Sequence, residues 1–223
     1  FKNKKYVVKE LKKIKNGIDR SEQIVKEYKF LKNIKYPLAS YSELDLVSDK
    51  DYFYISMNNI DGQDGIDYLE KNLHSYYRNL NNSLFIFLQM VFINYYLHSN
   101  GLVHLDLKLD NYMIEEINGK PYLNIIDFGL AECLKKGKFC EKNQSIDNTY
   151  KESVDVNKGT DIYFPFSMLD ENDHYTSYND DYYLITLTFF SLFGSVIGRD
   201  KYIQTFERQN IFYNLQFFED YFK

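Results

Sequence analysis

Two polar motifs near the middle of the chain constrain it more than any other feature. The first is the segment 104–111, which reads HLDLKLDN, and the second is the segment 127–129, which reads DFG. Asp106 or Asn111 alone could simply cap a turn, as Asp and Asn often do. Turn formation does not explain why two carboxylates, a lysine and an amide occur together in this order. The set is therefore a candidate functional site.

The segment between the motifs is typical of a β-hairpin. Residues 112–114 and 122–126 are short apolar runs, and Asn118-Gly119 between them is a dipeptide that favours a tight hairpin turn. A hairpin brings Asn111 and Asp127 together although they are distant in the sequence. Magnesium takes few protein oxygens and keeps phosphates and waters as ligands, so these two residues form a candidate metal site.

In order and content the two motifs resemble the H-x-D-x-K-x-x-N loop and the D-F-G turn of the eukaryotic-type protein kinases. The resemblance implies an α+β, bilobal fold. The small β-rich N-lobe is expected over 1–57, the hinge over 58–62 and the mainly helical C-lobe over 63–223. It further implies transfer of the γ-phosphate of ATP to a serine or threonine hydroxyl of a protein substrate, with Mg²⁺.

The resemblance assigns roles to the residues of the catalytic loop. Asp106 would orient the substrate hydroxyl and accept its proton, and Lys108 would stabilise the charge of the transferring phosphoryl group. Asn111 and Asp127 would bind the metal. Thr160, in a G-T-x-x-Y segment, would hydrogen-bond near Asp106 and Lys108. His104 is expected to pack under Phe128 and to have no acid–base role.

The same resemblance predicts the nucleotide site. Lys9, in a Val-Val-Lys strand, would contact the α- and β-phosphates, and Glu27, on the next helix, would pair with it. Glu27 could instead be a solvated helix carboxylate, and Asp64, assigned to the ribose, could be an exposed loop carboxylate. The further residues assigned to the nucleotide are Val7, Met57 as gatekeeper, Asn58 and Ile60 through their backbones, and Met113.

Local patterns predict the helices that carry these residues. Ser21 is a good N-cap for a helix whose apolar stripe is Ile24, Phe30, Leu31 and Ile34. Helical periodicity begins again near Ile66. The apolar stretch 84–97, interrupted by Gln89 and Asn94, is too short to span a bilayer and is expected to be a buried helix that ends at Gly101. Residues 181–185 resemble the D-x-W-x-L start of the central helix of the kinases, and the resemblance implies that Asp181, or Asp180, anchors the catalytic loop.

The chain also departs from the kinase pattern. No glycine-rich loop precedes Lys9 within these 223 residues, and whether one lies upstream stays open. The A-P-E segment lacks its glutamate, and few residues follow Asp181. In lacking the glycine-rich loop the chain resembles the FIKK kinases of AT-rich parasites. The excess of lysine over arginine is typical of an AT-rich genome. Leu105 replaces the arginine that normally receives a phosphorylated activation loop. Activity is therefore expected not to depend on phosphorylation of the polar segment 135–158.

Composition excludes several function classes. The 223 residues are 44% hydrophobic, which is enough for a substantial core. The net charge of −5 gives no sign of nucleic-acid binding. The two cysteines, Cys133 and Cys140, are expected to stay reduced. The expected location is cytoplasmic, with export possible if a signal lies upstream. Two other functions fit the motifs, a catalytically inactive kinase-like scaffold and a small-molecule phosphotransferase. The protein substrate and the oligomeric state are open.

Overall fold

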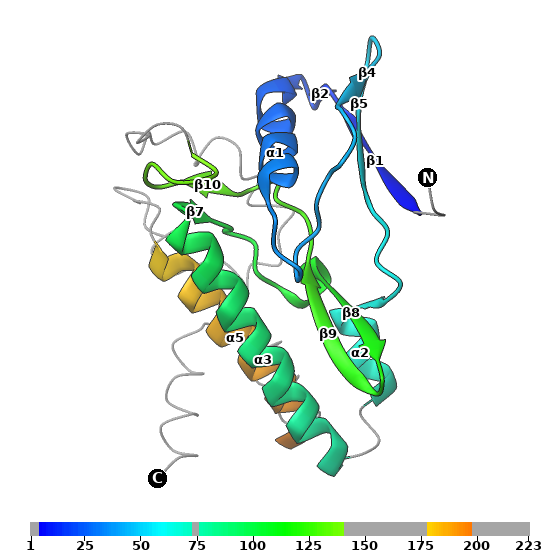
Figure 1. The fold of residues 1–223 in the computed structure, drawn as a ribbon, viewed down its shortest axis with the longest axis vertical. Coiled ribbons are helices and arrows are strands. Elements are labelled where there is room, and N and C mark those ends of the chain that lie inside the picture. The colour runs from blue at the N-terminus through cyan, green and yellow to red at the C-terminus, as the bar shows by residue number, and fades with distance from the viewer. Residues whose placement is uncertain (1–4, 73–75, 141–177, 198–223) are drawn as a thin grey trace.

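The computed structural model describes residues 5–72, 76–140 and 178–197 (Figure 1). Short strands and one helix form the upper part of the molecule in Figure 1, and long helices with a hairpin form the lower part. This arrangement of β-structure first and helices later is the expected α+β architecture.

The upper sheet is built around β5 (Tyr52–Asn58). It pairs antiparallel with β1 (Tyr6–Lys12) on one side and with β4 (Val47–Ser48) on the other. In this register Lys9 is the partner of Ile55, which is fully buried. The strand predicted from Val-Val-Lys is therefore confirmed, and it holds Lys9 beside the core. After β1 the chain makes a small hairpin from β2 (Ile14–Lys15) and β3 (Ile18–Asp19).

Helix α1 (Ser21–Asn33) packs its apolar stripe into the core. The four predicted positions, Ile24, Phe30, Leu31 and Ile34, are all buried. The prediction that Ser21 is the N-cap is wrong, because Ser21 is the first helical residue and Arg20 precedes the helix. The carboxylate of Asp19 instead accepts a hydrogen bond from the Ser21 amide at 2.8 Å, which satisfies a free N–H of the first turn.

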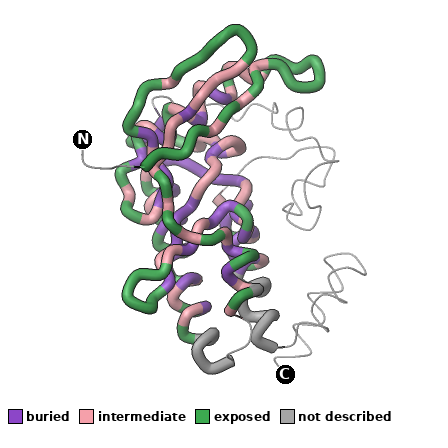
Figure 2. Tube along the Cα trace, turned by 90° about the vertical axis from the view of Figure 1, so that its right-hand side faces the viewer, coloured by how far each residue is buried: buried purple, intermediate pink, exposed green. Residues whose placement is uncertain are grey.

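Within the described residues, the helices of the lower part are α2 (Gly65–Asn72), α3 (Tyr76–Ser99) and α5 (Tyr178–Ile197). α3 lies beside α5 and the hairpin strand β9, and it buries one face only (Figures 1 and 2). Its buried face includes Ile86, Met90, Ile93 and Leu97, whereas Leu84, Leu88, Phe92 and Tyr95 are exposed. The expected buried helix is therefore half-buried. Among the described residues, no helix combines the length and hydropathy needed to cross a membrane.

The predicted hairpin is formed by β8 (Tyr112–Ile117) and β9 (Lys120–Ile125). Its turn has positive φ at both Asn118 (53°) and Gly119 (73°), as an Asn-Gly hairpin turn requires. The short strand β6 (Gln63–Asp64) extends the sheet on the β8 side. The buried side chain of Gln89 on α3 donates to the Pro121 carbonyl and accepts from the Leu123 amide. These bonds fix the hairpin on the helix.

The expectation of two reduced cysteines is wrong in the structure. Strand β7 (Leu102–Val103) pairs antiparallel with β10 (Glu132–Cys133), and Cys133 forms a disulfide with Cys140. Their Cα atoms are 5.7 Å apart, a normal separation for a disulfide. The sequence alone could not show this, because the tight loop that brings the two thiols together depends on its contact with the end of α3.

Gly101 offers a direct test of that contact. It has φ +88°, and an added Cβ would lie 2.3 Å from the carbonyl oxygen of Lys135. Gly119 also has positive φ but has open space around it. We expect Gly119→Ala to lower the free energy of unfolding by about 1 kcal/mol, from backbone strain alone. Gly101→Ala should lower it by about 1–3 kcal/mol more, because the loop must move. Equal losses in urea unfolding would contradict the close packing.

Candidate functional site

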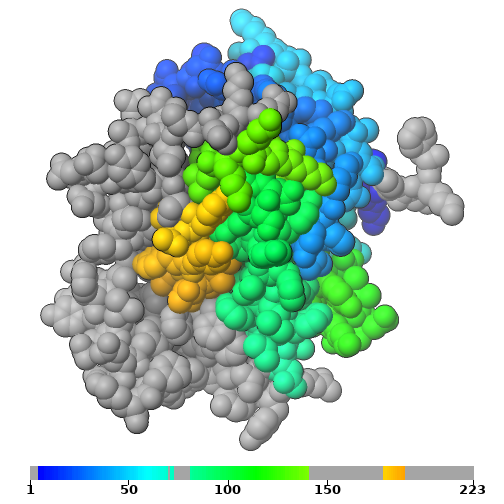
Figure 3. Space-filling model, turned by 60° about the vertical axis from the view of Figure 1, so that its left-hand side comes forward, coloured from blue at the N-terminus to red at the C-terminus, as the bar shows by residue number. Residues whose placement is uncertain are grey.

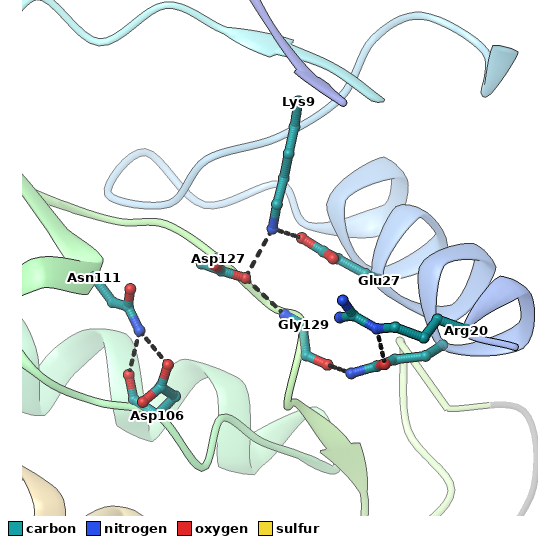
Figure 4. A network of polar contacts seen from close by, with 8 residues as sticks. Lys9, Arg20, Glu27, Asp106, Asn111, Asp127 and Gly129 are labelled. Carbon is teal, nitrogen blue, oxygen red and sulfur yellow. Dashed lines mark hydrogen bonds and ion pairs between the residues drawn. The ribbon is translucent and has the colours of Figure 1, made fainter. Parts of the chain in front are cut away.

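Lys9 joins three segments that are remote in the sequence. Its Nζ lies 2.6 Å from Oε1 of Glu27 and 2.9 Å from Oδ1 of Asp127 (Figure 4). β1 supplies the lysine, the buried face of α1 supplies Glu27, and the turn after β9 supplies Asp127. Glu27 is only 3% exposed, so it is not the solvated carboxylate that the sequence left open. The predicted pairing of Lys9 with Glu27 is thus present in the structure.

The electrostatics of this cluster follow from burial and close opposite charge. Burial alone would lower the pKa of Lys9, but the carboxylates of Glu27 and Asp127 outweigh it and raise the pKa. For Asp127, Lys9 and the Gly129 amide outweigh burial, so the pKa is lowered. Burial dominates at Glu27 and raises its pKa, although Lys9 opposes the change. Lys9 is therefore a cation, and Asp127 an anion, at neutral pH.

The Asp-Phe-Gly turn is held from both sides. Asp127 has φ 61°, a left-handed conformation that its own side chain supports by accepting the Gly129 amide at 3.0 Å. Phe128 is fully buried, and its ring meets that of His104 edge-on with centroids 5.0 Å apart. Burial lowers the pKa of His104, which keeps the imidazole neutral. This is the packing role expected for His104.

Asp106 and Asn111 form a second polar cluster beside the first (Figure 4). The short 3-10 helix η1 (Leu109–Asn111) turns Asn111 back, so that its Nδ2 donates to Oδ2 of Asp106 at 2.6 Å and to the Asp106 carbonyl at 2.8 Å. Because the amide nitrogen faces two acceptors, Oδ1 of Asn111 points away from Asp106. Nζ of Lys108 lies 3.1 Å from the other carboxylate oxygen of Asp106.

These residues fit a magnesium ion. Oδ1 of Asn111 and the carboxylate of Asp127 are hard oxygen donors, and the hairpin places them at its open end. The Ile126 amide donates to the Asn111 carbonyl at 2.9 Å, which ties together the two segments that carry Asn111 and Asp127. The Asp127 side chain is 44% exposed, so phosphates and waters can complete the coordination.

The catalytic loop is anchored from α5 by a buried carboxylate. Asp181 accepts hydrogen bonds from the amides of His104 and Leu105, both at 2.8 Å, and lies 2.9 Å from Nε2 of His98. Leu105 has φ 66°, a strained conformation that these bonds maintain. Of the two aspartates that the sequence left open, Asp181 makes this contact. Thr188, about two helical turns after Asp181 on α5, donates to the Leu107 carbonyl at 3.0 Å.

Four of the residues assigned to the nucleotide form two cross-strand pairs in two separate sheets. Met57 is the β5 partner of Val7, and Met113 is the β8 partner of Asp64. The amide of Asn58 donates to the Tyr41 carbonyl at 3.1 Å. A purine contact at Asn58 would therefore use its carbonyl oxygen.

Asp64 has a structural task that the sequence did not suggest. Its Oδ1 accepts the Asp67 amide at 2.8 Å, so it caps the start of α2. Its role at the ribose stays a prediction, as does that of Ile60. Thr160 lies outside the described residues, together with the segment around it.

Two contacts between α1 and the segment that follows Asp127 were not predicted from the sequence. Gln23 donates through Nε2 to the Gly129 carbonyl at 2.8 Å and accepts from Nε of Arg20. Lys26 forms an ion pair with Glu132. Gln23 and Lys26 lie four and one residues before Glu27, on the same helix. That spacing is the one signal in the sequence, and it does not reveal what the opposite surface carries.

Comparison with known proteins decides the family. The sequence profile of the protein kinase domain matches residues 1–216. The chain belongs to the protein kinase family. The similar proteins include the ovarian-specific serine/threonine-protein kinase Lok of Drosophila melanogaster, 29% identical over 115 residues, which are 52% of this chain and 23% of that protein. NUAK family SNF1-like kinase 1 of Mus musculus is 29% identical over 129 residues, 58% of this chain and 18% of that protein.

A shorter match is more similar. A probable serine/threonine-protein kinase 2 of Plasmodium falciparum is 60% identical over 38 residues, 17% of this chain and 8% of that protein. In each of these three relatives the matched part spans less than a quarter of the relative's own length. The resemblance to FIKK kinases stays a prediction.

Asp181, but not Asp180, should protect the backbone amides of His104 and Leu105 from hydrogen exchange. In Asp181→Ala the amides of His104 and Leu105 lose a charged acceptor inside the protein, which typically costs about 1.5–3 kcal/mol per bond. We expect hydrogen exchange at these two amides to become at least about tenfold faster. Asp180→Ala is the matched comparison, and it should leave the two amides protected. The assignment is wrong if Asp180→Ala is the variant that exposes them.

The raised pKa of Glu27 predicts a pH-dependent effect on stability. A folded pKa above 4.5 means that ionised Glu27 favours folding less as the pH rises through that value. Glu27→Gln cannot ionise, so its melting temperature relative to the wild type should increase between about pH 4 and about pH 7. The control is Glu22→Gln, which removes the same charge from an exposed position of the same helix. A difference that decreases with pH would mean that Lys9 outweighs burial.

Proposed function

We propose that this chain is an ATP- and Mg²⁺-dependent protein serine/threonine kinase. The observation that carries the proposal is the position of Lys9, bonded to both Glu27 and Asp127 across 118 residues of sequence. A lysine held in this way presents a fixed cation beside a metal-binding carboxylate, as the transfer of a phosphoryl group requires. The proposal takes residues 1–57 as the N-lobe, 58–62 as the hinge and 63–223 as the C-lobe.

Each charged group then has a distinct task. The Lys9 ammonium holds the α- and β-phosphates, and Glu27 keeps the ammonium in place. Asp106 faces the substrate hydroxyl and takes its proton as the oxygen bonds to the γ-phosphorus and the bond to ADP breaks. Lys108, 3.1 Å from Asp106, neutralises negative charge on the transferring group.

The metal site consists of Asn111 and Asp127. A bound Mg²⁺ would neutralise charge on the β- and γ-phosphates. Asn111 has a second task, because its two hydrogen bonds orient the Asp106 carboxylate. Asp127 likewise orients Lys9. The metal site would therefore take one ligand from each of the two polar clusters.

Specificity for serine and threonine rests on Lys108, on the predicted role of Thr160 and on the names of the relatives. The replacement of the usual arginine by Leu105 supports a second proposal, that activity does not require phosphorylation of the segment 135–158. In the structure Gln23 on α1 bonds the Gly129 carbonyl directly, and Glu27 on the same helix is linked to Asp127 through Lys9.

The two alternative functions are less well supported. A scaffold has no need for Lys9, Asp106, Asn111 and Asp127 to be present together and correctly bonded. A small-molecule phosphotransferase shares the two aspartates. The profile match to the protein kinase domain over nearly the whole chain favours a protein substrate.

The test is phosphate transfer from labelled Mg-ATP to arrays of serine, threonine and tyrosine peptides. We expect transfer to serine and threonine, and Asp106→Asn should reduce kcat by at least about a hundredfold with little change in nucleotide affinity. Asp127→Ala should weaken Mg-ATP binding itself. Asp110→Asn, at an exposed position nearby, is the matched control for lost charge. Mainly phosphotyrosine would refute the specificity, and unchanged transfer by Asp106→Asn would refute the mechanism.

A further inference from the structure

The disulfide closes a loop that packs against the catalytic half of the molecule. Within the loop, Gly137 and Cys140 exchange backbone hydrogen bonds. At its edge, the Leu134 amide donates to the Gly101 carbonyl at 2.9 Å. An added Cβ on Gly137 would lie 2.1 Å from the Asn100 carbonyl, so the loop and the end of α3 are in close backbone contact. We call residues 133–140, closed by their disulfide, the cystine loop.

The cystine loop is continuous with the site on both sides. Through β10, Cys133 is the partner of Leu102 and Glu132 the partner of Val103, directly before the catalytic-loop residue His104. The Glu132 side chain pairs with Lys26 on α1. Lys26 precedes Glu27, which bonds Lys9. A short path of bonded residues therefore leads from the disulfide to the phosphate-binding lysine.

We propose that Cys133 and Cys140 form a reversible redox-modification site that controls how firmly α1 is held against the Asp-Phe-Gly turn. This inference rests on the proposed kinase function. With the disulfide formed, β10 is held by its pairing with β7 and by the cystine loop that begins at Cys133. Glu132 is then held opposite Lys26. With two free thiols the loop is no longer closed, so Glu132 and α1 lose part of their restraint.

The chemistry is thiol–disulfide exchange with a low-molecular-weight thiol such as glutathione. Its thiolate attacks Sγ of Cys133, the Cys133–Cys140 bond breaks, and the Cys140 thiolate leaves and takes a proton. A second thiol then attacks the mixed disulfide, which releases Cys133 and one molecule of small-molecule disulfide. Two electrons pass to the protein, and the reverse reaction with that disulfide restores the loop.

Accessibility favours attack at Cys133. Cys133 is partly exposed, whereas Cys140 is 2% exposed and its sulfur lies 3.7 Å from the Gly101 carbonyl oxygen. Figure 3 shows the segment that includes β10 and the cystine loop at the surface, between α1 and α3. A small thiol can therefore reach one sulfur of the pair without unfolding the lower part of the molecule.

The experiment uses the full chain equilibrated in glutathione buffers from reducing to oxidising. Mass spectrometry after alkylation measures the fraction of disulfide, and peptide phosphorylation measures kcat/KM. We expect kcat/KM to fall by about fivefold or more on reduction, the lower end of typical coupling between sites. Because the chain has two cysteines, a Cys133→Ser/Cys140→Ser variant should lose the whole response. A wild type whose thiols never interconvert, or whose activity ignores their state, would overturn the proposal.

A second pair of variants tests the path through α1. Lys26→Met breaks the ion pair with Glu132, so the disulfide should still titrate while the activity no longer follows it. Lys29→Met removes the same charge from an exposed position of α1 and should keep the response. If both variants keep the response, the proposed path is wrong.

A readout that needs no activity separates this inference from the kinase assignment. Hydrogen exchange of α1, residues 21–33, should be slower in the oxidised wild type than in the reduced one. It should be the same in both buffers for the double serine variant. An inactive protein that shows this difference would refute the proposed function and support the redox site. An active protein without it would refute the redox control alone.

Discussion

The bonding of Lys9 to Glu27 and Asp127 is the interaction on which the rest of the site depends. It joins a strand, a helix and a turn, and no two of these segments are adjacent in the sequence. Burying Glu27 is unfavourable unless a cation lies beside it, and Lys9 in turn needs both carboxylates to stay charged in a partly buried position. The same contacts that stabilise the charges therefore determine where α1 lies.

A second buried carboxylate does the same for the catalytic loop. Asp181 reaches it from a helix 76 residues further along the chain and binds the amides of His104 and Leu105. These bonds hold Leu105 in a left-handed conformation that an unsupported leucine would leave. Asp106 then projects toward Asn111 and Lys108. Helix α5 thus acts on the site through the backbone, without contributing a group to the chemistry.

Most of the buried side chains are apolar, and the buried polar side chains of the site include Glu27, His104, Asn111 and Asp181. The Lys26–Glu132 pair and the Gln23 bond to Gly129 are further polar contacts of α1. Together these contacts hold α1 against the segment that follows Asp127. The cystine loop continues that segment toward the end of α3.

The motifs of the candidate site and the local elements could be predicted from the sequence. Asp106, Asn111 and Asp127 could be named because motif order and an Asn-Gly hairpin are local properties. The apolar stripe of α1 was equally readable. Four features became visible only in the folded chain: the contact made by Asp181 rather than Asp180, the capping by Asp64, the ion pair of Lys26 and the disulfide. Each depends on which group lies opposite across a packed interface, and residue spacing along one segment carries no information about that partner.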